Sequence, residues 1–176
     1  MRAGEKEHLE GLAKTGYCAA LKRYFHGVRE HLIFTPGGHI LHLVNIPGNR
    51  HDVNGLYALL HDSFKGHLVG DNAYWPKQEK REQLAAKGVT ITADARSNWA
   101  VKNTPEEEAL LKERSKIERF IGLFDRQFHA DRTLNHSPRH YAARRWTKAA
   151  AHNAARLLNH RLDIPAETYL HFRLAA

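Results

Sequence analysis

A chain of 176 residues with 42% hydrophobic residues is long enough to bury one substantial core and too apolar to be disordered throughout. No apolar stretch approaches the roughly 20 residues of a membrane-spanning helix, and the charged opening residues lack the apolar core of a secretory signal, so we expect a chain without membrane contact. The single cysteine, Cys18, excludes an internal disulfide or a multi-cysteine zinc site and fits a reducing cytoplasm, while the net charge of +8 suits a phosphate backbone as partner.

The first half of the chain predicts a β-hairpin followed by alternating helices and strands. Val28 and Ile33 are typical of the strand character of the first segment, and the pair Gly37-Gly38 indicates the turn. The expected elements in chain order are strands over 22–36 and 39–48, a helix over 49–64 capped by Asn49 or Asp52, a strand over 66–71, a helix running from Pro76 to Gly88, and a strand over 89–95.

From residue 103 onward the pattern becomes helical. Thr104, Pro105 and Glu107 form the signature of a capped helix start, and we expect one helix to run from there to residue 128. A second long helix is expected to open at Ser137-Pro138 and to run to residue 160. The order of elements indicates a single α/β domain over residues 1–176, with a mixed sheet flanked by helices and two long helices at its C-terminal end. The apolar stripe of the first long helix is expected to contain Leu110, Ile117, Phe120, Ile121, Phe124 and Phe128.

Two acidic residues, Asp71 and Glu118, are the candidates for a catalytic or metal-binding role. Asp71 follows directly after the predicted strand "GHLVG", where a turn or a helix cap is the plain interpretation and a metal ligand is the alternative. Glu118 lies at the edge of the apolar stripe of the first long helix, with Arg114 one turn before it. From the pattern alone, an ion pair between Arg114 and Glu118 is favoured over a catalytic role.

Three segments, by their sequences and their order along the chain, favour a catalytic role for these acids over a simple ion pair. They read "GNRHDVNGLYALL", "GHLVGDNAYWPKQEKREQLAAKGVTITADARSN" and "RSKIERFIGLFDRQF". Together they resemble bacterial insertion-sequence transposases of the DDE superfamily, whose catalytic core is ribonuclease-H-like, and the resemblance covers residues 10–160. The second segment is similar to that family's G-D-x-x-Y strand end, and the third is similar to its R-x-x-x-E helix.

The resemblance implies a fold and a set of roles. It implies a ribonuclease-H-like α/β fold and an enzyme that cuts DNA by water attack on a phosphodiester, then joins the freed 3′-hydroxyl to a target strand. It implies Asp71 as the second catalytic acid and Glu118 as the third, both as ligands of Mg²⁺ or Mn²⁺ in a two-metal site. It also implies that Arg114 orients Glu118 or contacts a DNA phosphate, and that Tyr74 lies near the metal site. The implied partners are transposon-end and target DNA, with a homodimer or the full-length transposase as protein partner, at the nucleoid of a bacterial cytoplasm.

One departure from the family pattern bears directly on activity. The family's first acid is an Asp on the opening strand, but the residues before Tyr24 offer only Glu5, Glu7 and Glu10. These three glutamates lie in what we interpret as the tail of the connection that follows the opening strand. We therefore expect the chain to be truncated, without the first catalytic strand and any N-terminal DNA-binding region, and to be inactive on its own.

Basic residues supply the remaining candidates for DNA contact. Related transposases often carry Lys seven residues after the last acid, whereas this chain has Asp125 there, and Arg126 beside it is the candidate substitute. The other basic residues are explained as well by a solvated helix surface as by a phosphate-binding face. The residues of this candidate basic face are Lys102, Arg119, Arg126, Arg132, Arg139, Arg144, Arg145, Lys148 and Arg156.

Other interpretations stay open at the level of sequence. The neighbouring histidines His26, His31, His39 and His42 lack the spacing of a zinc site, and Asp52 is more simply a helix cap than an active-site acid. Three classes of function remain: a DDE transposase catalytic domain, a non-catalytic remnant that binds DNA or full-length transposase and modulates transposition, and a ribonuclease-H-like nuclease with cellular substrates. The combination of "GDNAYW" with "RSKIE" favours the transposase.

Overall fold

The computed structural model describes residues 9, 11–19, 21–60, 64–95, 102–130 and 137–165. The chain divides into two compact units that interleave along the sequence. Unit 1 comprises Met1–Glu10, Leu32–Leu43 and Lys116–Ala176, and unit 2 comprises Gly11–His31 and Val44–Ser115. That residues 1–176 act as one domain stays a prediction.

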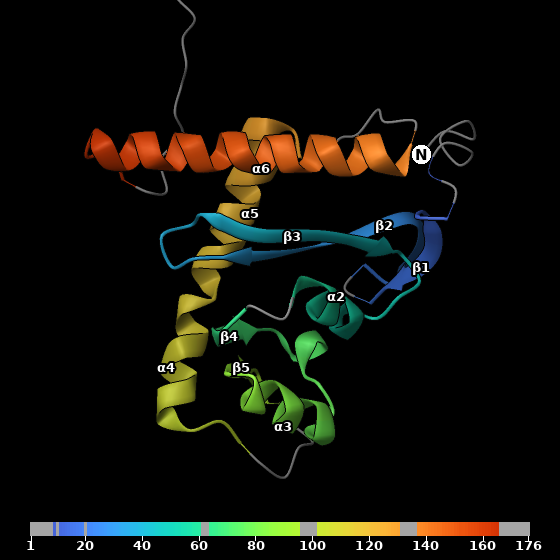
Figure 1. Ribbon diagram of the computed structural model, residues 1–176, viewed down its shortest axis with the longest axis vertical. Coiled ribbons are helices and arrows are strands. Elements are labelled where there is room, and N and C mark those ends of the chain that lie inside the picture. The colour runs from blue at the N-terminus through green and yellow to red at the C-terminus, as the bar shows by residue number, and fades with distance from the viewer. Residues whose placement is uncertain are drawn as a thin grey trace, which may run out of the picture. The chain divides into compact units, whose positions relative to one another are not determined.

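The fold is of the predicted α/β class, with parallel and antiparallel strands and flanking helices, consistent with a ribonuclease-H-like fold (Figure 1). The described strands form a three-stranded sheet in the order β1-β2-β3 and a two-stranded sheet of β4 and β5. The elements are β1 (Lys14–Cys18), β2 (Arg23–Phe34), β3 (Ile40–Pro47), α2 (Asp52–Leu59), β4 (Gly66–Gly70), the 3-10 turn η1 (Asn72–Tyr74), α3 (Gln78–Ala86), β5 (Val89–Ala93), α4 (Pro105–Glu113), α5 (Ser115–Phe128) and α6 (Pro138–Arg161).

The hairpin of β2 and β3 matches the predicted strands, and the predicted turn lies between them. The Thr35 N–H donates to the His39 carbonyl at 2.8 Å, and Gly38 has a positive φ of 81° that glycine adopts without strain. The additional strand β1 pairs antiparallel with β2, from Lys14 opposite Gly27 to Cys18 opposite Arg23. The sequence did not indicate this strand, because five residues with a glycine at their centre form too short a pattern. Glu5, Glu7 and Glu10, which are expected in a connection, lie outside the described residues.

Unit 2 contains a parallel strand pair joined by a helix, and this arrangement places Asp71. β4 and β5 run in register from Gly66 opposite Val89 to Gly70 opposite Ala93, and α3 packs against β5 (Figure 1). The helix α3 begins at Gln78, two residues later than the sequence indicated, because Lys77 is its N-cap. Asp71 is the first residue beyond the carboxyl end of β4.

The single helix predicted from 105 to 128 is wrong in one respect: it is two helices that meet at Arg114. The predicted capping box is confirmed, because the Glu107 N–H donates to Thr104 Oγ1 and the Glu107 carboxylate accepts from the Thr104 N–H. The buried side chains differ in part from the expected stripe. Leu110 and Ile121 of the expected stripe are exposed, at 39% and 37%, whereas Phe120, Leu123 and Phe124 are buried.

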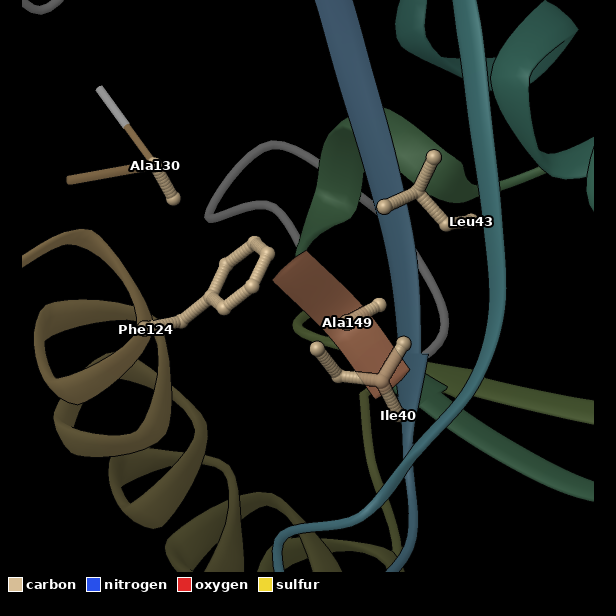
Figure 2. Close-up of a cluster of buried hydrophobic side chains, with 5 residues drawn as sticks. All are labelled: Ile40, Leu43, Phe124, Ala130 and Ala149. Carbon is tan, nitrogen blue, oxygen red and sulfur yellow. The ribbon is translucent and has the colours of Figure 1, made fainter. Parts of the chain in front are cut away.

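Unit 1 is built around the outer half of the hairpin, α5 and α6. Figure 2 shows side chains from these elements converging on Phe124, which is fully buried. The predicted start of α6 is confirmed, with Ser137 as its N-cap accepting from the His140 N–H. The buried cluster consists of Ile40, Leu43, Phe124, Ala130 and Ala149, with Leu32, Phe34 and Phe128 packed against it.

Two polar side chains of α6 fix the hairpin to this core. Asn153 pairs with both backbone groups of Ile40, accepting from its N–H at 2.7 Å and donating to its carbonyl at 2.8 Å. His152, which is 1% exposed, donates from Nε2 to the Gly38 carbonyl at 2.8 Å, with the ring of Phe124 edge-on at 5.6 Å. The amide of Asn153 thus takes the place of a neighbouring strand at Ile40 and satisfies backbone groups that would otherwise be buried without partners.

Candidate active site

Asp71 lies where the parallel strand pair ends, just past Gly70 and its partner Ala93. It is the N-cap of η1, and its Oδ1 accepts a hydrogen bond from the Ala73 N–H at 2.9 Å. The Tyr74 N–H donates to the Asp71 carbonyl at 3.1 Å, so side chain and backbone of Asp71 both close this turn. The interpretation of Asp71 as a turn residue is confirmed, and its half-buried carboxylate keeps further lone pairs for a second partner.

Tyr74 links this turn to strand β2. Its hydroxyl lies 2.7 Å from Nδ1 of His31, and the two rings meet edge to face at 5.6 Å between centroids. His31 is 2% exposed, and its other ring nitrogen, Nε2, has no hydrogen-bond partner among the described residues. A buried polar group without a partner is uncommon and costs stability, so the position of this ring is set by what surrounds it.

Asp52 does not cap its helix, so the capping interpretation is wrong. The N-cap of α2 is His51, and Asp52 is the first helical residue. The Asp52 carboxylate instead accepts from Nη1 of Arg29 at 3.0 Å, while the same guanidinium donates to the carbonyls of Gly48 and Tyr17. Arg29 therefore ties β2 to the start of α2 with three separate acceptors, and Asp52 serves that connection.

The protonation states in this part of unit 2 follow from burial. Burial lowers the pKa of His31 below its usual 6.5, and the nearby Arg29 acts in the same direction, while Asp52 and Asp71 oppose it. Burial also raises the pKa of Tyr74, and the negative charges of Asp52 and Asp71 add to that effect. Near neutral pH the imidazole is therefore neutral and the phenol keeps its proton, so the bond between them joins two uncharged groups.

Glu118 is an exposed residue in the first turn of α5. It belongs to unit 1, whereas Asp71 belongs to unit 2. That the two carboxylates meet in space, as the family pattern implies, stays a prediction.

The contacts of Arg114 and Arg126 in the structure are with residues of the chain other than those expected from the sequence. The ion pair that the structure gives Arg114 is with Asp94, at 3.4 Å, which ties the junction of α4 and α5 to the end of β5. Arg114 itself has helical backbone angles, with φ −57° and ψ −31°, and the predicted pair between Arg114 and Glu118 stays a prediction. Arg126 is exposed, and its guanidinium lies against Gly122 one turn earlier on α5. Contact of Arg114 or Arg126 with a phosphate stays a prediction.

A family model described as "Transposase DDE domain" matches residues 3–154, which is most of the chain. The chain belongs to the DDE transposase family. No curated protein and no solved structure matches it. The predicted family is thus confirmed, and with it a function in transposition and DNA as the substrate.

Transposases of this family use divalent metals, and carboxylates are suitable ligands for them. Within the described ranges of this transposase, no group of three or more His, Cys, Asp or Glu side chains is placed to hold a metal ion. Asp71 and Glu118 offer the hard oxygen atoms that Mg²⁺ and Mn²⁺ prefer, and neither carboxylate is buried. The donor chemistry of each carboxylate taken by itself fits these cations.

The basic face expected on this transposase is smaller than the sequence indicated. Arg145 and Arg156 are buried, at 4% and 5% exposure, with their guanidinium groups over the rings of Phe124 and Phe120. Arg145 also donates to the Ala130 carbonyl, so neither arginine is presented to solvent. Arg132 lies outside the described residues. The basic residues that are exposed are Lys102, Arg119, Arg126, Arg139 and Arg144.

Some residues of the site region were missed from the sequence. His31 was considered only as a zinc candidate, although it shares the alternating inward positions of β2 with Gly27 and Ile33. That alternation is the signal that could have placed it inside. Asp94, the partner of Arg114, follows its strand as Asp71 follows β4, and the parallel between the two positions was visible in the sequence. No helix of the described part is long and apolar enough to cross a membrane.

Proposed function

We propose that this transposase chain derives from an enzyme that cleaves DNA strands and transfers them during the movement of an insertion sequence. The observation that carries the proposal is the family match over residues 3–154, with Asp71 at the carboxyl end of a parallel strand. Asp71 and Glu118 would hold Mg²⁺ or Mn²⁺, and the bound cations would stabilise the attacking and leaving oxygens at phosphorus. The DNA substrates would be transposon ends and a target strand in the bacterial cytoplasm.

We further propose that the 176-residue chain does not cleave DNA by itself. The first aspartate in its sequence is Asp52, whose carboxylate is paired with Arg29. A two-metal site of the family type needs a third carboxylate beside Asp71 and Glu118. With Asp52 engaged at the start of α2, the described residues supply no further aspartate on a strand end except Asp94, which pairs with Arg114.

The dependence of thermal stability on metal tests cation binding at Asp71 without requiring catalysis. A cation that binds only the folded protein raises the melting temperature, and Mn²⁺ or Mg²⁺ is expected to do so for the wild type. Asp71→Asn keeps the shape of the side chain and is expected to remove the effect. Glu79→Gln removes an equal charge from the exposed start of α3 and is expected to keep it. A metal effect of the same size in all three proteins would contradict a site at Asp71.

Nicking of supercoiled plasmid tests the proposed inactivity. We expect no product from the purified chain in Mn²⁺ at any protein concentration. Metal-dependent nicking by the wild type that Asp71→Asn abolishes would show that the chain completes a catalytic site, and the inactivity would be refuted.

The net charge of +8 and the exposed arginines favour a second candidate, a non-catalytic module that binds DNA or pairs with full-length transposase and modulates transposition. Binding through phosphates weakens steeply with salt, roughly 0.9 per contact in the slope of log K against log[salt]. Arg119→Gln with Arg144→Gln is expected to reduce that slope by about 2. Affinity for duplex DNA that is independent of salt would count against this candidate.

A further inference from the structure

We propose that His31 is a positioning residue for Asp71, acting through the hydroxyl of Tyr74. This inference rests on the proposed function, because it concerns the acid that the proposal assigns to metal binding. The proposed role of His31 and Tyr74 involves no contact with the substrate. Their effect is on the turn that carries the acid.

The first step is the construction of the turn after β4. Asp71 and Tyr74 are the two ends of one short turn, joined by the hydrogen bond from the Tyr74 N–H to the Asp71 carbonyl. The Asp71 side chain is held inside the same turn by the Ala73 N–H. A turn of this size has few bonds of its own, so an anchor on its last side chain restrains the whole turn, including the carboxylate at its start.

The second step is the rigidity of the anchor. The His31 ring is 2% exposed and lies against the backbone of α2 at Gly55. A Cβ atom at position 55 would come within 2.2 to 2.4 Å of three atoms of this ring, so there is no free space on that side. The ring is therefore confined between α2 and Tyr74, and the backbone of His31 is held in strand β2.

The third step is the kind of bond that joins the two side chains. Nδ1 of His31 and the Tyr74 hydroxyl are 2.7 Å apart, which is the separation of a well-formed hydrogen bond. The charges near this bond are Asp52, Asp71 and Arg29. His31 thus fixes the end of the turn that carries Asp71 to strand β2.

The experiment uses the full chain and two readouts. Hydrogen exchange of the Ala73 amide, measured by NMR, reports the bond to Asp71 directly and needs no metal. Mn²⁺ affinity, measured by titration, reports the carboxylate as a ligand. Tyr74→Phe removes only the hydroxyl, and Tyr57→Phe makes the same chemical change on α2 as the matched control.

For Tyr74→Phe we expect Ala73 exchange to rise by about tenfold and Mn²⁺ affinity to fall by about tenfold, which corresponds to a hydrogen bond of about 1.4 kcal/mol. Amides of the β4–β5 pair such as Leu68 should keep their protection, which separates a local effect from general loosening of unit 2. His31→Phe should have the same local effect, and the double variant should be no worse than either single one.

The outcomes separate this inference from the proposed function. Unchanged Ala73 exchange in Tyr74→Phe would overturn the positioning role, whatever happens to metal binding. Faster Ala73 exchange in a protein whose Mn²⁺ binding does not depend on Asp71 would support the positioning role and contradict the metal site. If His31→Phe does not fold, Tyr74→Phe alone decides, because it leaves the buried ring of His31 in place.

Discussion

Replacement of Gly55 by alanine tests the close packing of α2 on His31. A methyl group at this position would lie 2.2 Å from Cδ2 of the His31 ring, where carbon atoms in contact are normally about 3.5 Å apart or more. Overpacking of this kind costs about 1–3 kcal/mol, and the upper end applies because the ring is confined on its other side by Tyr74. Alanine returns about 1 kcal/mol through its better helix propensity. The expected net loss is therefore about 2 kcal/mol in the free energy of unfolding.

Urea denaturation followed by circular dichroism measures this loss, and Gly122 of α5 provides the matched control. Among the described residues, a Cβ atom at position 122 would meet the Arg126 guanidinium at 3.5 Å or more, which is an ordinary contact. Gly122→Ala is therefore expected to gain up to about 1 kcal/mol from helix propensity. The reasoning would be refuted if Gly55→Ala were as stable as Gly122→Ala, because the two substitutions share the propensity gain and differ only in the predicted clash.

Two further predictions concern α6 in unit 1. Asn153→Ala leaves both backbone groups of Ile40 without partners, and we expect it to lower the free energy of unfolding, measured by urea denaturation, by about 2 kcal/mol. The control Asn54→Ala removes one surface hydrogen bond to the His51 carbonyl and should lower it by less than about 0.5 kcal/mol. Equal losses in the two variants would contradict the role given to Asn153. Burial lowers the pKa of His152, and Arg156 and His39 act in the same direction, while the hydrogen bond to the Gly38 carbonyl opposes them. The unfolded chain therefore binds a proton at His152 more readily than the folded chain does. The free energy of unfolding should fall as the pH drops from about 7 towards 5. His152→Gln should reduce this dependence, leaving the part that His31 contributes through its own lowered pKa, while His160→Gln, on the exposed side of the same helix, should not reduce it. Identical pH profiles of wild type and His152→Gln would refute the assignment.

Local sequence patterns predicted most of the elements because their causes are local. Thr104 with Glu107 forms its capping box from residues three apart, and Ser137 with Pro138 starts α6 by the same short-range chemistry. The strand pair 66–71 and 89–95 was identified by its β-branched and flanking glycine residues, which placed Asp71 correctly at a strand end.

The features that were missed depend on contacts between distant residues. Nothing near Arg114 in the sequence marks a helix break, but its guanidinium reaches Asp94, twenty positions earlier in the chain. Residue type alone favours solvent-facing charges at Arg145 and Arg156, whereas aromatic rings from α5 cover both of them. The bond between His31 and Tyr74 joins residues 43 positions apart, and no pattern within either segment indicates it.

A double-mutant cycle of Mn²⁺ affinity determines whether Asp71 and Glu118 hold one cation together, as we propose. Asp71→Asn, Glu118→Gln and the double variant are titrated under the same conditions, with Glu79→Gln as the control for lost charge. A shared ion predicts that each single substitution weakens binding by at least tenfold and that the double variant is little weaker than either one. Independent losses that add, or a Glu118→Gln variant that binds Mn²⁺ as the wild type does, would contradict a common site for the two acids.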